Sequence, residues 1–131
     1  MVHGEFKILE PRFNAISSYF EMSYDELLIY RKPVNFYSAE QIKTAVDDPI
    51  IVHFTSTFLC NRPWQEGSSH PFKKQWIKRI SSYQKAIQIK NISLKQKNLK
   101  IFFYLLPRRA SICLFGVLQA YVRPMFLRMK L

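Results

Sequence analysis

The chain has 131 residues, of which 48% are apolar and 15% aromatic, and this composition excludes a disordered or low-complexity protein and fits a domain with a real core. Its net charge is +11, but all nine acidic residues lie between Glu5 and Glu66, whereas the segment from Gly67 to Leu131 carries fourteen Lys and Arg and no acid. This asymmetry predicts a polyanionic partner for the second half, either nucleic acid or an anionic membrane surface.

The beginning of the chain carries no export signal that we recognise, so we expect a cytoplasmic protein. The two cysteines, Cys60 and Cys113, are far apart and lack the spacing of metal ligands. We expect both to be free thiols without a chemical role.

Two short helices are expected early in the chain, after a lead-in of fifteen residues without a clear period. Ser23 is followed three residues later by Glu26, which makes a capping box, and the apolar residues behind it extend to a proline. A second capping box, Ser38 with Gln41, opens a segment that ends at Pro49. Each pattern predicts a helix that a proline stops.

The β-branched run PIIVHF, residues 49–54, predicts a strand that is buried on both faces. The segment that follows it, residues 55–71, is rich in Ser, Asn, Gly and Pro and predicts a long loop. Because loops anchored to a rigid strand often carry sites, the histidine near the end of this strand, His53, is a candidate metal ligand. A lone histidine there is more often a hydrogen-bonded structural residue, and both interpretations stay open.

The basic second half predicts amphipathic helices. Pro71 fits the first turn of a helix that Ser69 or His70 caps, and apolar residues then recur at a spacing of four on one face, namely Phe72, Trp76 and Ile80. The Lys-rich stretch 86–100 shows no clear pattern. Beyond it, apolar blocks alternate with Arg and Lys, and the longest uncharged block, residues 110–122, has thirteen residues, short of the roughly 20 that a membrane span needs.

Three short motifs, HFTS at residues 53–56, NRPW at 61–64 and HP at 70–71, resemble the C-terminal motif of family 8 glycosyltransferases. In that family a strand ends in His, two residues and a small residue, usually glycine, and a loop leads on to Lys-Pro-Trp. The resemblance is to the branch that acts on bacterial surface polysaccharides and lipopolysaccharide, and it covers about residues 10–80.

The resemblance implies a retaining hexosyltransferase of the GT-A type, in which the histidine and an upstream Asp-x-Asp hold Mn²⁺, or Mg²⁺, against the diphosphate of a UDP-sugar. His53 takes the place of the metal ligand, Arg62 that of the lysine that contacts the diphosphate, and Ser56 that of the glycine beside the phosphate. Asn14 resembles a recurring asparagine of the family. Carboxylate, imidazole and phosphate ligands together suit Mn²⁺, and a guanidinium binds phosphate with two hydrogen bonds.

The chain contains no Asp-x-Asp, and its close pair of carboxylates, Asp47 and Asp48, falls at the expected end of a helix. We therefore expect an α+β chain that is the C-terminal fragment of a GT-A domain, with residues 1–80 from the catalytic domain and residues 81–131 as a basic amphipathic tail. The implied partner is a missing N-terminal, nucleotide-binding half. Without it the chain is expected to be inactive, and no catalytic residue is assigned.

The tail predicts association with an anionic membrane surface through Arg108, Arg109, Arg123 and Arg128, which flank its apolar blocks. The protein is then peripheral on the inner face of the membrane, and the resemblance implies a saccharide or lipid-linked acceptor. The alternatives are a small basic nucleic-acid-binding protein that uses the Lys-rich region 73–100 and an interaction module without catalysis. No nucleic-acid-binding motif is present, and the aromatic residues are grouped with aliphatic ones, so we expect no nucleic-acid partner.

Overall fold

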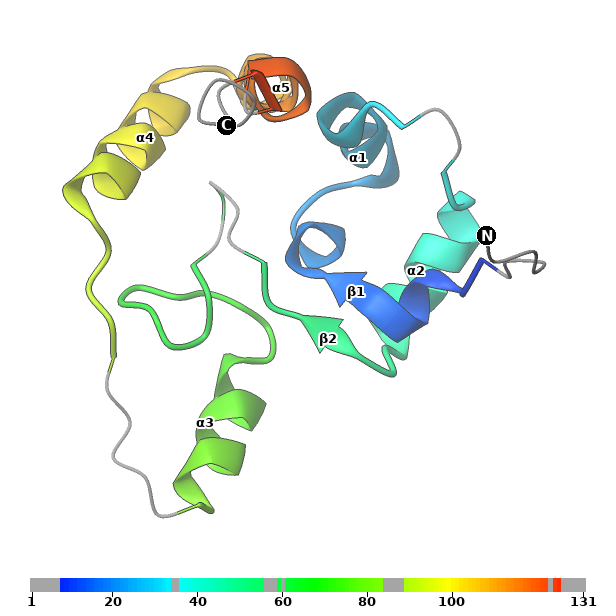
Figure 1. The fold of residues 1–131 in the computed structure, drawn as a ribbon, viewed down its shortest axis with the longest axis vertical. Coiled ribbons are helices and arrows are strands. Elements are labelled where there is room, and N and C mark those ends of the chain that lie inside the picture. Colours follow the sequence, from blue (N-terminus) through cyan, green and yellow to red (C-terminus); the bar gives the residue numbers. More distant parts are fainter. Residues whose placement is uncertain are drawn as a thin grey trace, which may run out of the picture.

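The computed structural model describes residues 8–33, 36–55, 59, 61–83, 89–122 and 124–125, except for the side chains at 95 and 96. Over these residues the chain is an α+β fold of short helices and a two-stranded parallel sheet (Figure 1). The elements are, in order, the 3-10 helix η1 (Pro11–Asn14), β1 (Ala15–Ile16), the 3-10 helix η2 (Ser17–Phe20), α1 (Tyr24–Arg31), α2 (Ala39–Asp47), β2 (Val52–His53), α3 (Lys73–Ser81), α4 (Leu94–Leu105), α5 (Arg108–Val117) and the π-helix η3 (Leu118–Val122).

Both expected capping boxes are present. Ser23 Oγ accepts a hydrogen bond from the backbone N–H of Glu26 at 3.2 Å, and the Glu26 carboxylate accepts one from the N–H of Ser23 at 3.0 Å. Ser38 and Gln41 form the same pair of bonds at the start of α2. Each box satisfies two backbone N–H groups that the first turn of a helix leaves without an intrahelical partner, and the two sequence predictions are confirmed.

The sheet pairs two strands of two residues each in parallel register, with Ala15 beside Val52 and Ile16 beside His53. The sequence predicts an irregular or partly extended lead-in over the first fifteen residues, and β1 begins at the last of these. A strand of two residues is too short to show a period of two, so the sequence contains no pattern that predicts β1.

The strand predicted over residues 49–54 with both faces buried is wrong in length and in burial. Ile50 and Ile51 precede β2, and their side chains are 50% and 54% exposed. Their backbone N–H groups both donate to the carbonyl oxygen of Arg12, at 2.9 and 3.1 Å, so the chain turns here instead of extending the ladder. In the part of the chain that the structure describes, β2 has β1 as its single neighbouring strand.

One hydrophobic core joins the beginning and the end of the chain. Its fully buried members include Leu27 of α1 and Ile112 of α5, both with no exposed surface. The remaining buried members are Ala15, Ile16, Tyr19, Met22, Tyr30, Ile42, Ala45, Phe103 and Phe115. Helices α4 and α5 therefore contribute to the same core as α1 and α2.

Helix α5 lies against α1, and a glycine allows their close approach (Figure 1). A Cβ atom at Gly116 would lie 2.9 Å from the carbonyl oxygen of Ile29 and 3.0 Å from that of Tyr30. Both oxygens belong to the backbone and cannot swing aside.

Helix α3 begins later than the sequence predicts. Its first residue is Lys73, and the residue before it, Phe72, supplies no side-chain cap, so the expectation of Ser69 or His70 as cap is wrong. His70 instead accepts a hydrogen bond at Nδ1 from the backbone N–H of Phe72, at 3.2 Å. Trp76 is half-buried on the apolar face that the spacing predicts.

Helix α4 forms over a stretch whose first half shows no clear sequence pattern, and it exposes an unusual amount of apolar surface. Large apolar side chains that are at least 45% exposed on it are Leu94, Leu99, Ile101, Phe102, Tyr104 and Leu105. Pro107 separates α4 from α5. None of the helices in the described ranges has both the length and the apolar character that a membrane crossing requires.

Candidate metal and diphosphate site

His53 is the last residue of β2, and its side chain is exposed. Its Nδ1 atom lies 3.2 Å from the side-chain oxygen of Asn14, which directly precedes β1. An amide oxygen only accepts hydrogen bonds, so this contact favours the tautomer that carries its proton on Nδ1. That tautomer leaves the lone pair of Nε2 available, as a metal-binding histidine requires.

The described part of the chain does not build a complete metal site around His53. No group of three or more His, Cys, Asp or Glu side chains lies close together there. Mn²⁺ and Mg²⁺ favour about six ligands, mostly oxygens, so a single imidazole does not fit a complete site for either ion. Asp48, one of the two adjacent carboxylates noted in the sequence, forms an ion pair with Arg12.

Arg62 lies on a tight loop, and the end of this loop is joined by a β-bridge to the segment before α4. Its backbone N–H donates to Gln65 Oε1 at 2.9 Å, and its carbonyl accepts from the N–H of Gln65 at 2.9 Å. Gln65 in turn forms a parallel β-bridge with Lys90. The loop is thereby fixed, and the guanidinium carbon of Arg62 lies 5.7 Å from the centre of the Trp64 ring.

An aromatic cluster connects this loop to the end of the strand. Phe54, the residue after His53, meets the ring of Trp64 edge to face at a centroid distance of 6.1 Å, and it lies 5.0 Å from the ring of His70. Trp64 also lies 5.5 Å from Trp76 of α3. Trp64 thus packs against both Phe54 and Arg62, and the Phe54–Trp64 contact connects the residue after His53 to the loop that carries Arg62.

His70 is a buried structural residue rather than a second ligand. It is 3% exposed, and its Nε2 lies 3.2 Å from Ser17 Oγ while its Nδ1 accepts from the backbone N–H of Phe72 at 3.2 Å. Burial lowers the pKa of His70 because it penalises the charged imidazolium. Both ring nitrogens are used within the fold, in line with the scaffold role that the sequence indicates.

The structure describes only some of the other predicted site residues and one of the two cysteines. Ser56, Arg123, Arg128 and Cys60 lie outside the described residues. Arg109 is exposed, and Cys113 is an exposed free thiol. Arg108 is held by Glu26, to which it donates at 2.6 and 2.9 Å, so its charge is matched within the fold.

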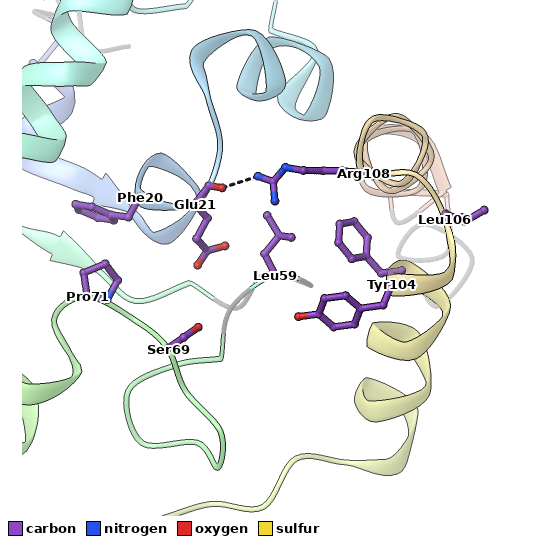
Figure 2. Close-up of a pocket in the computed structure, with 9 residues that line it drawn as sticks. Phe20, Glu21, Leu59, Ser69, Pro71, Tyr104, Leu106 and Arg108 are labelled. Atoms are coloured by element: carbon purple, nitrogen blue, oxygen red, sulfur yellow. Dashed lines mark hydrogen bonds between the residues drawn. The ribbon is translucent and has the colours of Figure 1, made fainter.

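A cavity of about 500 Å³ lies between the end of η2, the loop before α3 and the junction of α4 and α5 (Figure 2). It is lined by Phe20, Glu21, Leu59, Ser69, Pro71, Phe103, Tyr104, Leu106 and Arg108. Neither His53 nor Arg62 is among them. The lining comes from three segments that are far apart in the sequence, so no local motif could have predicted it.

Comparison with known proteins finds no matching family model, no matching curated protein and no matching solved structure. The resemblance to family 8 glycosyltransferases therefore stands on the motifs in residues 53–71 and remains a prediction.

Proposed function

We propose that this chain is the C-terminal portion of a metal-dependent, GT-A type glycosyltransferase that uses a nucleotide-sugar, in which His53 is one ligand of Mn²⁺ or Mg²⁺. One observation carries the proposal: the imidazole is exposed at the end of a parallel strand and held at Nδ1 by Asn14, which leaves Nε2 for a metal. Asn14 and His53, which resemble the asparagine and the histidine of the family, lie in contact although they are 39 positions apart in the sequence.

The carboxylates of such a site have to come from a second, N-terminal half that carries Asp-x-Asp. The sheet of the described residues supports this division, because it has two strands of two residues each, whereas parallel strands are normally covered on both faces and two short strands rarely stand alone. Ile50 and Ile51, each about half exposed beside β2, provide an apolar surface for a further layer. A metal bound there would act as a Lewis acid on the departing diphosphate.

Arg62 is proposed to bind the diphosphate of the donor, expected to be UDP. Its guanidinium lies against Trp64 and its loop is tied to Lys90, so little conformational freedom is lost on binding. Ser56 is proposed to approach the same phosphates. The proposed acceptor is a saccharide or lipid-linked saccharide of surface polysaccharide or lipopolysaccharide synthesis. The protein is proposed to be cytoplasmic and to bind peripherally to the inner face of the membrane.

Magnetic resonance of the isolated chain tests the metal proposal. Mn²⁺ added with UDP should broaden the ring signals of His53 at millimolar concentration. His53→Ala should abolish the broadening of neighbouring residues. Broadening that is confined to Asp47 and Asp48 would overturn the proposal, as would unchanged Mn²⁺-dependent UDP affinity for His53→Ala when an Asp-x-Asp half is joined to the chain.

A second candidate is a membrane-surface protein without catalysis, and the apolar surface of α4 favours it. Several large apolar side chains of α4 are at least 45% exposed, and residues 67–131 carry fourteen Lys and Arg and no acid, a charge that suits anionic lipids. Flotation with anionic and neutral vesicles, alongside a DNA-binding assay at low and high salt, separates the alternatives. Binding to DNA without binding to vesicles would favour the nucleic-acid interpretation instead.

A further inference from the structure

Helix α3 has a polar face that the proposed metal and diphosphate site does not use. Figure 1 shows α3 at one end of the longest axis of the molecule and α5 at the other. A cavity of about 340 Å³ lies along this face, and in the described part of the chain it is lined by Gln75, Lys78, Arg79 and Ser82. Spacings of three and four place these residues on one side of the helix. Trp76, whose ring packs against Trp64, is not among them.

Three cations belong to this face, because Lys74 lies one helical turn before Lys78, and Arg79 follows directly. All three side chains are exposed. Eight of the nine acidic residues fall within the described ranges, and none of these eight forms an ion pair with the three cations. The sequence after Glu66 contains no acid at all. A local charge of +3 is therefore available to an anion.

The carbonyl groups at the C-terminal end of a helix repel anions, but serine hydroxyls cover two of them in α3. Ser81 Oγ donates to the carbonyl oxygen of Ile77 at 2.9 Å, and Ser82 Oγ donates to that of Arg79 at 2.6 Å. Each bond reduces the partial negative charge that this end presents. The Ser82 proton is used in its bond, so the cavity offers a ligand the side-chain donors of Gln75, Lys78 and Arg79.

We propose that this face of α3 binds a small ligand with two or more linked phosphate groups, which Lys78 and Arg79 contact and to which Gln75 donates a further hydrogen bond. A phosphate group carries about −1.5 to −2 charges at pH 7, so two groups are needed to match three cations. A guanidinium binds phosphate through two parallel hydrogen bonds, and an ammonium group binds it as a point charge.

The size of the cavity favours a compact ligand over a nucleic acid. Small-molecule sites have volumes of roughly 300–1,000 Å³, and this cavity lies near the lower limit. Proteins that bind nucleic acids typically contact roughly 6–10 phosphates, which requires a longer basic surface than one side of a helix of nine residues. This inference goes beyond the proposed transferase function, because neither His53 nor Arg62 lines the cavity and either proposal can fail alone.

Nuclear magnetic resonance of the full chain, titrated with pyrophosphate in buffer free of divalent metal and at constant ionic strength, tests the proposal. The backbone amide signals of residues 75–82 should shift, and orthophosphate should bind at least about ten-fold more weakly, because it offers a single phosphate group. Arg79→Gln should weaken pyrophosphate binding about ten-fold. Arg79→Lys retains the charge without the two-point contact and should weaken binding less.

Arg109→Gln is the matched control, because it removes the same charge from an exposed position of α5. It should change pyrophosphate affinity by less than about two-fold, since distant surface charges are screened by salt. Equal losses in Arg79→Gln and Arg109→Gln would overturn the proposal, because binding would then follow the net charge. Shifts that are confined to residues 61–65 and are lost in Arg62→Gln would overturn it as well, and would support the diphosphate site alone.

Nucleic acids and anionic lipids also present phosphate groups, and competition distinguishes them from a small ligand. A DNA duplex and vesicles that contain phosphatidic acid are added separately at the phosphate concentration used for pyrophosphate. Weaker binding of both than of pyrophosphate supports the proposal. Tighter binding of DNA that Arg79→Gln abolishes would overturn the small-ligand assignment in favour of a nucleic acid, and the same result with vesicles would assign the face to a membrane.

Discussion

Arg108 and Glu26 form a two-point ion pair that ties the first residue of α5 to the first turn of α1. The Nε atom donates to Oε1 at 2.6 Å and Nη2 donates to Oε2 at 2.9 Å, across 82 residues of sequence. The same carboxylate accepts from the backbone N–H of Ser23 in the capping box. One side chain thus starts a helix and fastens a second helix to it, and the membrane role expected for Arg108 has to be shared with this structural one.

Glu26→Gln should lower the free energy of unfolding by about 1 kcal/mol at pH 7, because glutamine retains the capping box but loses the ionic character of the pair. Urea denaturation measures the change. Asp25→Asn removes the same charge one residue earlier, where no ion pair is described, and should cost less than half as much. Equal losses in the two variants would show that the pair with Arg108 adds nothing.

The ion pair also predicts an acid-sensitive component of stability. The hydrogen bond from Arg108 lowers the pKa of Glu26 below its usual range. Because the folded value is the lower one, the contribution is complete above the unfolded pKa of about 4.3 and is lost as the pH falls through the folded value. Unfolding curves should therefore show a steeper loss of stability below pH 4 for the unmodified chain than for Glu26→Gln. Parallel profiles would contradict this.

Gly116→Ala should destabilise the protein although alanine is the better helix former. The new Cβ would meet the carbonyl oxygens of Ile29 and Tyr30 at 2.9 and 3.0 Å, and separating α1 from α5 should cost about 2 kcal/mol net after a propensity gain of about 1 kcal/mol. Ala110→Gly, at an exposed position of the same helix, is the matched control and should cost only the propensity difference. A stabilised Gly116→Ala variant would show that the helices separate freely.

The sequence predicts the local features of this fold and misses the tertiary ones, for a physical reason. Capping boxes are encoded within four residues, so the starts of α1 and α2 could be predicted from Ser23 and Ser38 alone. The pairing of β1 with β2 and the contact of Asn14 with His53 depend on parts of the chain that meet only after folding. The strand prediction failed because β-branched residues also occur at exposed positions, as Ile50 and Ile51 show.

The burial of His70 leads us to expect a second, separate pH dependence of folding stability. Burial lowers the pKa of its imidazole, so the unfolded state binds the proton more tightly. The contribution of neutral His70 to the free energy of unfolding should be fully present above the unfolded pKa of about 6.5, and stability should decrease as the pH falls below that value. His70→Gln should lower stability by about 1–3 kcal/mol at pH 7.5, because it disturbs the bonds to Ser17 and Phe72, but it should flatten the profile between pH 7 and 5.5. An unchanged slope would mean that another group titrates there.

Substitutions of two adjacent phenylalanines of α4 distinguish a role in folding from a role in membrane-surface binding. Phe103 is 4% exposed and lies 5.9 Å from the ring of Phe115, whereas Phe102 is 49% exposed. Phe103→Ala should therefore cost about 3–5 kcal/mol of stability, as is usual for a buried phenylalanine. Phe102→Ala should change stability by less than about 1 kcal/mol but should weaken vesicle binding several-fold if α4 contacts lipid, because apolar area is lost from the contact.

The same substitution is thus expected to affect mainly stability at Phe103 and mainly vesicle binding at Phe102, and the two measurements distinguish the roles of the helix. Vesicle binding that is unaffected by Phe102→Ala, in a variant that keeps its full unfolding free energy, would remove the apolar surface of α4 from the membrane contact. Binding would then depend on the basic side chains alone, and raising the salt concentration would abolish it completely.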